Sequence, residues 1–293
     1  MPEPITKRTF LKAAAGIGGL LAARGPLNAY PLGLPLGLQP YTVRNELKAD
    51  FRGTLKKVAA MGYRELEVSG PGYDNFYGFQ PAELRQILNG FGLRTPSCHY
   101  GAPKDEEEWK RHMDGAHQLG LQYMLCGTPP ARAESLDGWK RTAELFNKLG
   151  KHCREAGFHF GYHNHNFEFR VYDGVTGYDQ LLRSSDPDLV KMEIDCFWMT
   201  FAGHDPVDYL KRQPQRFVML HIKDLKPGYP PTTGRFEGNP FTEVGSGIID
   251  WKRIFDAARH TSVDHYFVEQ DLWDRPPLES ARMSADYLKK LKV

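Results

Sequence analysis

The sequence predicts an α/β fold, a single-domain (β/α)8 TIM barrel that spans residues 33–293. First, short apolar runs alternate eight times with amphipathic stretches, which indicates strand–helix units around a parallel sheet. Second, several amphipathic stretches end in glycine followed by an aromatic residue or leucine, as at Gly62-Tyr63 and Gly120-Leu121. Such a glycine is typical of the left-handed cap that turns a helix back toward a strand. Third, eight is the number of strands that closes this kind of barrel.

The eight expected strands lie at residues 37–42, 65–69, 95–100, 123–126, 159–165, 190–195, 217–223 and 266–271. The eight expected helices lie at residues 51–61, 81–89, 105–119, 139–156, 177–184, 206–212, 251–260 and 278–291. Pro81 and the acidic turn after Asp105 are typical helix starts, and Asp250 is expected to cap the helix that follows it. A doubly wound open sheet is disfavoured, because Gln39-Pro40-Tyr41 follows the first strand instead of a glycine-rich phosphate loop.

The first 29 residues have the pattern of a secretory leader. Lys7-Arg8-Thr9-Phe10-Leu11-Lys12 precedes the apolar run 13–23, and small residues near Ala29 offer a cleavage position. The basic pair resembles a twin-arginine signal with lysine in the first position, so we expect export to the periplasm. The apolar run is short and rich in glycine and alanine, so no stable membrane span is expected in the mature chain. The competing interpretation is an amphipathic first helix.

Charge and cysteine usage exclude some classes of function. The chain has 38 basic and 36 acidic residues, and without residues 1–29 it keeps 34 and 35, a net charge near −1. A nearly neutral mature protein has no electrostatic reason to bind nucleic acid. The four cysteines have no CxxC spacing, and the three that lie in apolar strand-like runs are expected to be small buried side chains. Export would allow a disulfide, but the spacing does not require one.

Ionisable side chains gather at the ends of the expected strands, and in a barrel these ends form the catalytic mouth. Strand alternation places four pairs on one face each: His163 with His165, Glu193 with Asp195, His221 with Lys223, and Glu269 with Asp271. The second and third strands add Glu67 and His99. If these faces point inward, imidazoles and carboxylates converge, which suits one divalent ion: Mn²⁺, Mg²⁺, Co²⁺ or Zn²⁺. For any single residue, the alternative is a helix cap, an exposed carboxylate or a satisfied core histidine.

Five segments carry a family resemblance: Tyr162-His163-Asn164-His165, residues 194–199, residues 221–224, residues 244–251, and Val268-Glu269. In this order and spacing the chain resembles the xylose isomerase-like TIM-barrel superfamily over residues 33–290. That superfamily includes sugar-phosphate and ketose epimerases, inosose dehydratases and endonuclease IV.

The resemblance implies that strands five to eight supply the metal ligands, here His163, Asp195, His221 and Glu269. His163 stands where the epimerases have glutamate, much as in the inosose dehydratases. Glu168, a few residues further on, is the alternative first ligand or a substrate contact.

A metal site of this kind supports removal of a proton from a carbon next to a carbonyl or hydroxyl. Glu269, His165 and Lys223 are the expected catalytic residues. The expected substrate is a small sugar or cyclitol, which His99, Glu168, Trp198 and Gln39 would contact. Histidine in place of glutamate favours one-base chemistry, either β-elimination from a keto sugar or inosose, or an isomerisation.

Three classes of function follow. A metal-dependent sugar isomerase, epimerase or lyase is favoured. A nuclease of the endonuclease IV kind is disfavoured by the neutral charge and the leader. A carbohydrate-binding barrel that has lost catalysis is the third class.

Overall fold

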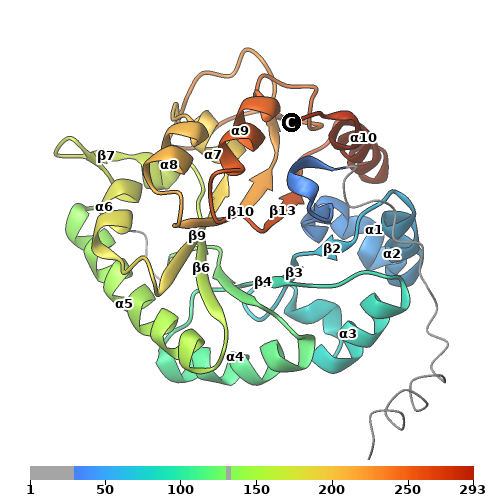
Figure 1. Ribbon diagram of the computed structural model, residues 1–293, viewed down its shortest axis with the longest axis horizontal. Helices are drawn as coiled ribbons and strands as arrows, with labels where there is room; N and C mark the ends of the chain where they lie inside the picture. Colours follow the sequence, from blue (N-terminus) through green and yellow to red (C-terminus); the bar gives the residue numbers. More distant parts are fainter. Residues whose placement is uncertain (1–29, 130–132) are drawn as a thin grey trace, which may run out of the picture.

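The computed structural model describes residues 30–129 and 133–293, so the expected leader, residues 1–29, lies outside the described residues. The strands lie at the centre and the helices surround them (Figure 1). No helix in the described ranges combines the length and the apolar character needed to cross a membrane.

Nine parallel strands form the central sheet in the order β2-β1-β13-β10-β9-β6-β5-β4-β3. Their bounds are β1 Gly37–Leu38, β2 Glu65–Leu66, β3 Val68–Ser69, β4 Ser97–Tyr100, β5 Tyr123–Cys126, β6 His159–His163, β9 Val190–Asp195, β10 Phe217–Ile222 and β13 His265–Val268. β2 and β3 are two halves of one barrel strand, separated only by Glu67. The sheet therefore has eight strand positions and closes on itself, which confirms the predicted barrel.

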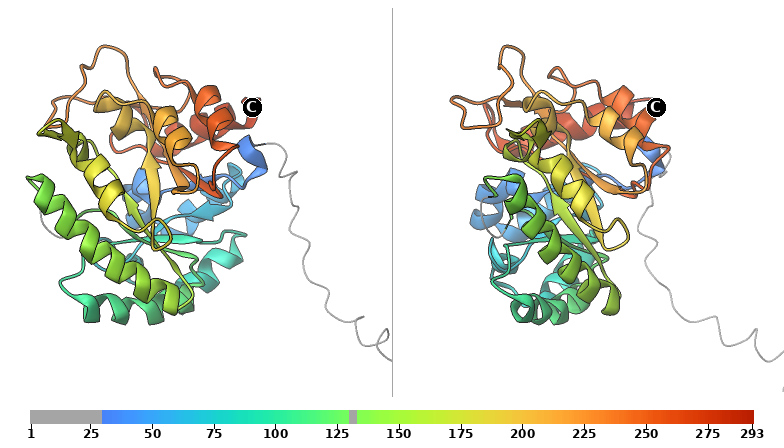
Figure 2. Two further views of the ribbon diagram at one scale, coloured as in Figure 1. Left: turned by 60° about the vertical axis from the view of Figure 1, so that its left-hand side comes forward. Right: turned by 90° about the vertical axis from the view of Figure 1, so that its left-hand side faces the viewer.

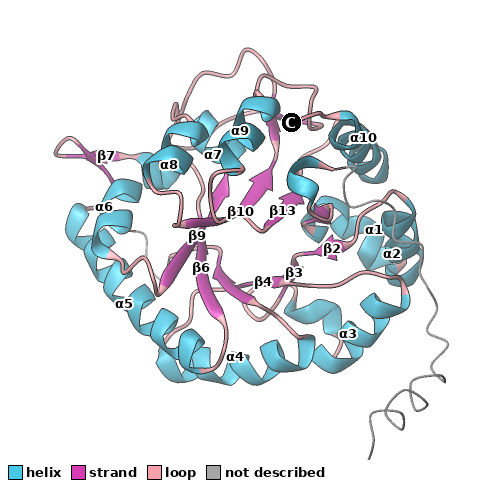
Figure 3. Cartoon of the chain, viewed as in Figure 1, coloured by secondary structure: helices cyan, strands magenta, loops and turns pink. Residues whose placement is uncertain are grey.

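Helices follow the strands and form the outer layer (Figure 3). They are α1 Arg44–Ala49, α2 Phe51–Ala60, α3 Pro81–Gly90, α4 Glu106–Leu119, α5 Leu136–Glu155, α6 Gly177–Ser184, α7 Cys196–Phe201, α8 Pro206–Arg212, α9 Trp251–Ala258 and α10 Pro277–Lys290. Two short hairpins decorate the C-terminal rim of the barrel: β7 Val171–Tyr172 with β8 Val175–Thr176, and β11 Asp224–Leu225 with β12 Phe241–Thr242. The views in Figure 2 show the loops of the second half of the chain projecting from one side of the barrel.

Three local differences from the expected elements have physical reasons. The first strand ends at Leu38, because Pro40 begins a 3₁₀ turn that the Gln39 side chain caps. α5 begins at Leu136 rather than at residue 139, because the Ser135 hydroxyl accepts a hydrogen bond from the backbone of the first turn. α7 was not expected, and it follows β9 directly because the Asp195 side chain caps its first turn.

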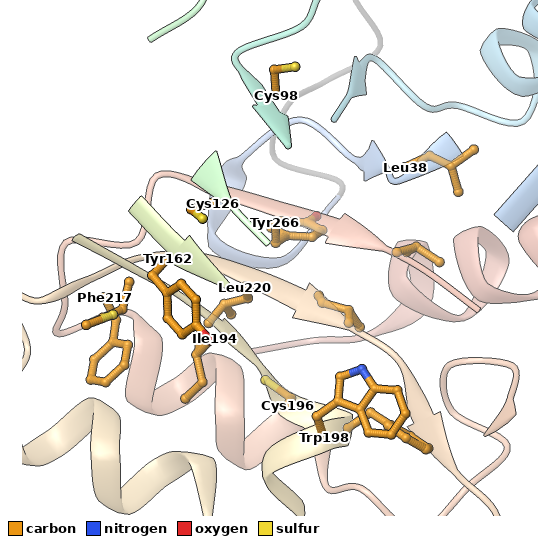
Figure 4. Packing of buried hydrophobic residues seen from close by; sticks show 14 of the residues in the cluster. Leu38, Cys98, Cys126, Tyr162, Ile194, Cys196, Trp198, Phe217, Leu220 and Tyr266 are labelled. Carbon is orange, nitrogen blue, oxygen red and sulfur yellow. The ribbon is translucent and has the colours of Figure 1, made fainter. Parts of the chain in front are cut away.

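Apolar side chains fill the space between the barrel and its helices, including Leu38, Tyr162, Ile194 and Leu220 (Figure 4). A smaller group packs separately: Tyr123, Leu125, Val218, Met219 and Phe267. The four cysteines are buried and unpaired. A burial pattern of this kind makes the barrel a rigid support for the side chains at its mouth.

Asp224 organises the turn into α9. Its carboxylate accepts hydrogen bonds from the backbone of Leu225, Gly245 and Ile249 and from the indole of Trp251, at 2.8–3.2 Å. A Cβ at Gly247 would lie 2.2 Å from Asp224 Oδ1, so only glycine fits there. Gly247 therefore allows the turn that Asp224 stabilises.

Candidate active site at the mouth of the barrel

A cavity of about 380 Å³ opens at the C-terminal ends of the strands. Its lining is mostly polar or aromatic and comprises Gln39, Tyr41, Ser69, Tyr73, His99, Gly127, Thr128, His163, His165, Lys223, Glu269 and Asp271. A cavity of this size accommodates a monosaccharide or a cyclitol, and its polar groups can hydrogen-bond hydroxyls. A larger hollow of about 880 Å³, whose lining includes Tyr30, Arg259 and Val293, shares no residue with this cavity.

Four residues form what we call the mouth cluster: Asp195, Lys223, Glu269 and Asp271. The Lys223 ammonium lies at its centre, 3.1 Å from Asp195 Oδ2, 2.6 Å from Glu269 Oε2 and 3.4 Å from Asp271 Oδ1. His221 Nδ1 lies beside the cluster, 3.0 Å from Glu269 Oε2 and 3.8 Å from Asp195 Oδ2.

The Asp195 carboxylate caps α7 with one oxygen and directs the other toward the mouth cluster. Its Oδ1 accepts the backbone N–H of Trp198 at 2.8 Å and so caps α7. Its Oδ2 is buried and has no hydrogen bond within the described residues. The cap thus holds the carboxylate in one orientation and leaves one oxygen directed at the cluster.

Four more residues form what we call the floor cluster: Glu67, His99, His163 and Glu193. Glu193 precedes Asp195 by two residues on β9, so it lies one inward-facing layer deeper in the barrel. His163 is its neighbour in register on β6. The Glu193 Oε2 atom lies 2.9 Å from His99 Nε2, 3.0 Å from His163 Nδ1 and 3.3 Å from His221 Nε2.

Glu67 completes the floor. Its Oε2 atom lies 2.5 Å from His221 Nε2 and 3.0 Å from His99 Nε2, and its Oε1 accepts the Ser97 hydroxyl at 2.7 Å. The Gln39 amide donates to the same carboxylate at 3.3 Å. The His221 ring is therefore held at both nitrogens: Nε2 contacts Glu67 and Glu193 of the floor cluster, and Nδ1 contacts Glu269 of the mouth cluster.

Ion pairs outweigh burial in setting the pKa values of Lys223 and Glu269 in the mouth cluster. Burial lowers the pKa of Lys223, but the three carboxylates outweigh burial and hold that pKa well above its usual value. Burial raises the pKa of Glu269, but Lys223 and His221 outweigh it and lower the pKa to about 2. Burial raises the pKa of Asp271 to about 7. At neutral pH, Lys223 is thus a cation and Glu269 a carboxylate.

On the floor, burial lowers the pKa of His99, but Glu67 and Glu193 outweigh it and raise that pKa to about 9. Burial, with Glu67, raises the pKa of Glu193 to about 7. Burial and the neighbouring His221 hold the pKa of His163 well below its usual value. Imidazoles are the only basic side chains that form ion pairs with Glu67 and Glu193 in the described part of the chain.

His165 lines the cavity without taking part in either cluster. Burial, reinforced by Lys223, lowers its pKa to about 3, so the imidazole is neutral at physiological pH. Its Nδ1 is buried and has no partner within the described residues. Its ring lies 5.6 Å from that of Trp198 and 5.8 Å from that of Phe167, which limits its rotation.

The structure brings most of the expected site residues together. Asp195, His221 and Glu269 offer ligand atoms within 4.8 Å of one another, whereas His163 is grouped with His99, Glu193 and His221. The Nε2 atom of His163 is still only 3.7 Å from Asp195 Oδ2.

Two expected substrate contacts lie behind the cavity instead of lining it. Glu168 is completely buried, and its Oε1 accepts the Tyr162 hydroxyl at 2.6 Å and the His165 backbone N–H at 3.0 Å. Glu168 therefore supports the segment that carries His165. Trp198 is 7% exposed, and its ring centroid lies 5.6 Å from the Lys223 ammonium.

Other site residues were not among those expected to act. Glu67, Glu193 and Asp271 follow the strand alternation noted in the sequence, so a signal for them existed. Tyr41, Thr128 and Gly127 line the cavity from loops without a polar pattern of their own, and only the closed barrel shows their position.

The donor set fits a divalent metal. Asp195 Oδ2 is a buried carboxylate oxygen that forms an ion pair with Lys223, and His221 Nδ1 and Glu269 Oε2 lie beside it. One nitrogen and two carboxylate oxygens suit Mn²⁺, Co²⁺ or Zn²⁺ and tolerate Mg²⁺. Glu67 would then act as the carboxylate partner that fixes the tautomer of a metal-binding histidine.

Known proteins share this fold and sequence pattern. Inosose dehydratase from Lacticaseibacillus casei is 24% identical over 87% of this chain and 96% of its own length. A sugar phosphate isomerase/epimerase from Parabacteroides distasonis superposes with a TM-score of 0.77 at 28% identity, covering 88% of this chain and 96% of that one. The IolI protein, solved with a bound zinc atom, shares the fold with a TM-score of 0.66 at 15% identity, over 86% and 96% of the two chains.

These relatives include sugar-processing enzymes, in agreement with the ionisable groups at the barrel mouth. A family model described as the xylose isomerase-like TIM barrel matches residues 55–291. This chain belongs to the xylose isomerase-like TIM-barrel family.

Proposed function

We propose that this protein is a divalent-metal-dependent enzyme that removes a proton next to the carbonyl of a keto sugar or inosose and eliminates water. Relatives named inosose dehydratase and sugar phosphate isomerase/epimerase support this reaction class. Elimination is preferred over epimerisation because the family resemblance implies that His163 stands where the epimerases have glutamate.

The observation that carries the proposal is the position of His165. Its imidazole lines the cavity and keeps an unpartnered Nδ1 among the described residues. A neutral imidazole can accept a proton from carbon, and one without a competing hydrogen bond needs no rearrangement to do so. By contrast, His163 and His221 are both engaged with carboxylates.

Asp195, His221 and Glu269, with His163 close by, would hold the metal. A divalent ion there supplies Lewis-acid polarisation of the substrate oxygens. Lys223 lines the cavity, and its ammonium can donate a hydrogen bond to the carbonyl oxygen as negative charge develops on it. Asp271 lies 3.4 Å from this ammonium and would keep it at the mouth if a metal ion shared the other carboxylates.

The elimination balances without a further reactant. His165 takes the proton from the carbon next to the carbonyl, and the electrons of the C–H bond form the enolate that Lys223 stabilises. The enolate then expels the hydroxyl group on the adjacent carbon, which receives the proton back from the His165 imidazolium and leaves as water. The product is an unsaturated ketone.

Solvent exchange tests the proposal on the whole expected class of substrates. The protein loaded with Mn²⁺ is incubated in D₂O with inososes and keto sugars, and NMR follows exchange at the carbon next to the carbonyl. We expect exchange at one carbon, followed by an alkene signal. His165→Ala should abolish exchange and keep the bound metal, whereas Asp195→Asn should lose the ion held by Asp195, His221 and Glu269.

Two results would reject the proposal. Tight binding of these compounds without exchange would support the carbohydrate-binding alternative. Normal exchange in His165→Ala would remove this histidine as the base.

A further inference from the structure

The floor of the site has the composition of a metal centre of its own. His99 on β4, His163 on β6, Glu193 on β9 and His221 on β10 each offer one ligand atom, and these atoms lie within 4.8 Å of one another. All four side chains are buried, with exposed fractions of 0–9%. This set shares only His221 with the group formed by Asp195, His221 and Glu269.

The distances agree with a coordination sphere. The Glu193 Oε2 atom lies 2.9 Å, 3.0 Å and 3.3 Å from the imidazole nitrogens of the three histidines. In a tetrahedral zinc site with bonds of about 2.0–2.1 Å, neighbouring ligand atoms lie about 3.3 Å apart. The Glu193 contacts therefore already match the spacing of ligand atoms, and the imidazole nitrogens, which lie within 4.8 Å of one another, would move closer together around an ion.

Charge compensation distinguishes the floor from the mouth. The mouth carboxylates share the Lys223 ammonium, so they already contact a permanent cation. Glu67 and Glu193 have only imidazole partners among the described ion pairs, although both are completely buried. The imidazolium forms of His99 and His221 compensate these two carboxylates, and a dication with neutral imidazoles would supply the same charge.

A second observation points to an ion. Glu193 Oε1 is buried and has no hydrogen-bond partner in the described part of the chain. Three imidazoles thus gather around one oxygen of a carboxylate whose other oxygen is free. A carboxylate in this state can rotate toward an ion without breaking a hydrogen bond of Oε1.

We propose that His99, His163, Glu193 and His221 form a second cation site that takes Zn²⁺ or Co²⁺. Three nitrogens and one oxygen suit these ions and disfavour Mg²⁺, which prefers oxygen ligands. His221 contributes Nε2 to this site and directs Nδ1 to the mouth, so with an ion at both sites it would release its ring proton and bridge the two ions as an imidazolate. Glu67 Oε2, beside both His99 and His221, balances the remaining charge.

Metal counting tests the proposal independently of turnover. The full chain is stripped with a chelator and titrated with Zn²⁺, and bound zinc is measured by equilibrium dialysis with mass spectrometry. We expect two equivalents per chain. Glu193→Gln and Asp195→Asn should each retain one equivalent, and the double variant none. Glu243→Gln, which changes a buried carboxyl outside the site, should retain two.

Cobalt adds a spectroscopic readout. Co²⁺ at the nitrogen-rich site should give the intense visible band of four-coordinate cobalt, and this band should persist in Asp195→Asn and disappear in Glu193→Gln. His99→Asn serves as a second floor variant if circular dichroism shows that Glu193→Gln is unfolded.

The outcomes separate this proposal from the proposed function. The wild-type chain could bind one equivalent of zinc that is lost in Asp195→Asn and kept in Glu193→Gln and His99→Asn. This result would overturn the floor site and leave the mouth ion in place. A single equivalent that only the floor variants lose would support the floor site and remove the metal from the proposed mechanism. A wild-type chain that binds no zinc would overturn both.

Discussion

Replacement of Lys223 by methionine tests whether its ammonium holds the mouth cluster together. The change keeps most of the side-chain volume and removes the only lysine or arginine that pairs with these carboxylates in the described chain. Removing one partner of a buried ion pair costs about 3–5 kcal/mol. A domain of this size loses about 2–4 °C in Tm per kcal/mol, so we expect Tm to fall by roughly 6–20 °C.

A divalent ion should reverse much of this loss. An ion that binds only the folded state at 100 times its Kd contributes about 2.7 kcal/mol. Mn²⁺ should therefore stabilise Lys223→Met more than wild type, because the wild-type ammonium already compensates the carboxylates. Turnover should still be lost, because the ion cannot replace the hydrogen bond that Lys223 gives the carbonyl oxygen.

The assay is urea denaturation at neutral pH, in chelator and then in excess Mn²⁺. Lys252→Met, which removes an exposed lysine, is the matched control and should leave the free energy of unfolding unchanged. A loss below about 1 kcal/mol in Lys223→Met, together with equal stabilisation of both proteins by Mn²⁺, would refute the reasoning.

Three further predictions concern other parts of the chain. Burial raises the pKa of Glu168 to about 7, so wild type should lose up to about 3 kcal/mol of stability as pH rises from about 4.5 to 8, and Glu168→Gln should lack this loss. Asp224→Ala leaves four donors unpaired and should lower the free energy of unfolding by about 4 kcal/mol or more, measured in urea. We also propose that residues 1–29 direct export by the twin-arginine route, so Arg8→Lys should retain a fused reporter in the cytoplasm.

Each of these has a contrary result. Parallel pH profiles for wild type and Glu168→Gln would show that this carboxyl is ionised throughout. A loss below about 1 kcal/mol in Asp224→Ala would mean that water satisfies the donors. Continued export of the Arg8→Lys reporter would reject the twin-arginine assignment.

The barrel was predictable because its determinants are local. Apolar periodicity and glycine caps such as Gly120, with a φ of 77°, specify where each helix ends and the next strand begins. Parallel strands of a closed barrel place their carboxyl ends at one mouth, so alternation alone brought Asp195, His221 and Glu269 to a common point. The starts of helices were harder to predict where a side-chain N-cap sets them, as Ser135 does for α5 and Asp195 does for α7.

The sequence by itself determined which ionisable side chains share one face of each strand, because side-chain direction follows the alternation of the strand. Only the tertiary structure decided which atom meets which partner. Register between strands and side-chain rotation place His163 with Glu193, direct the two nitrogens of His221 to different layers, and turn Glu168 toward Tyr162. These choices depend on distances between atoms far apart in the chain, and no local pattern encodes such distances.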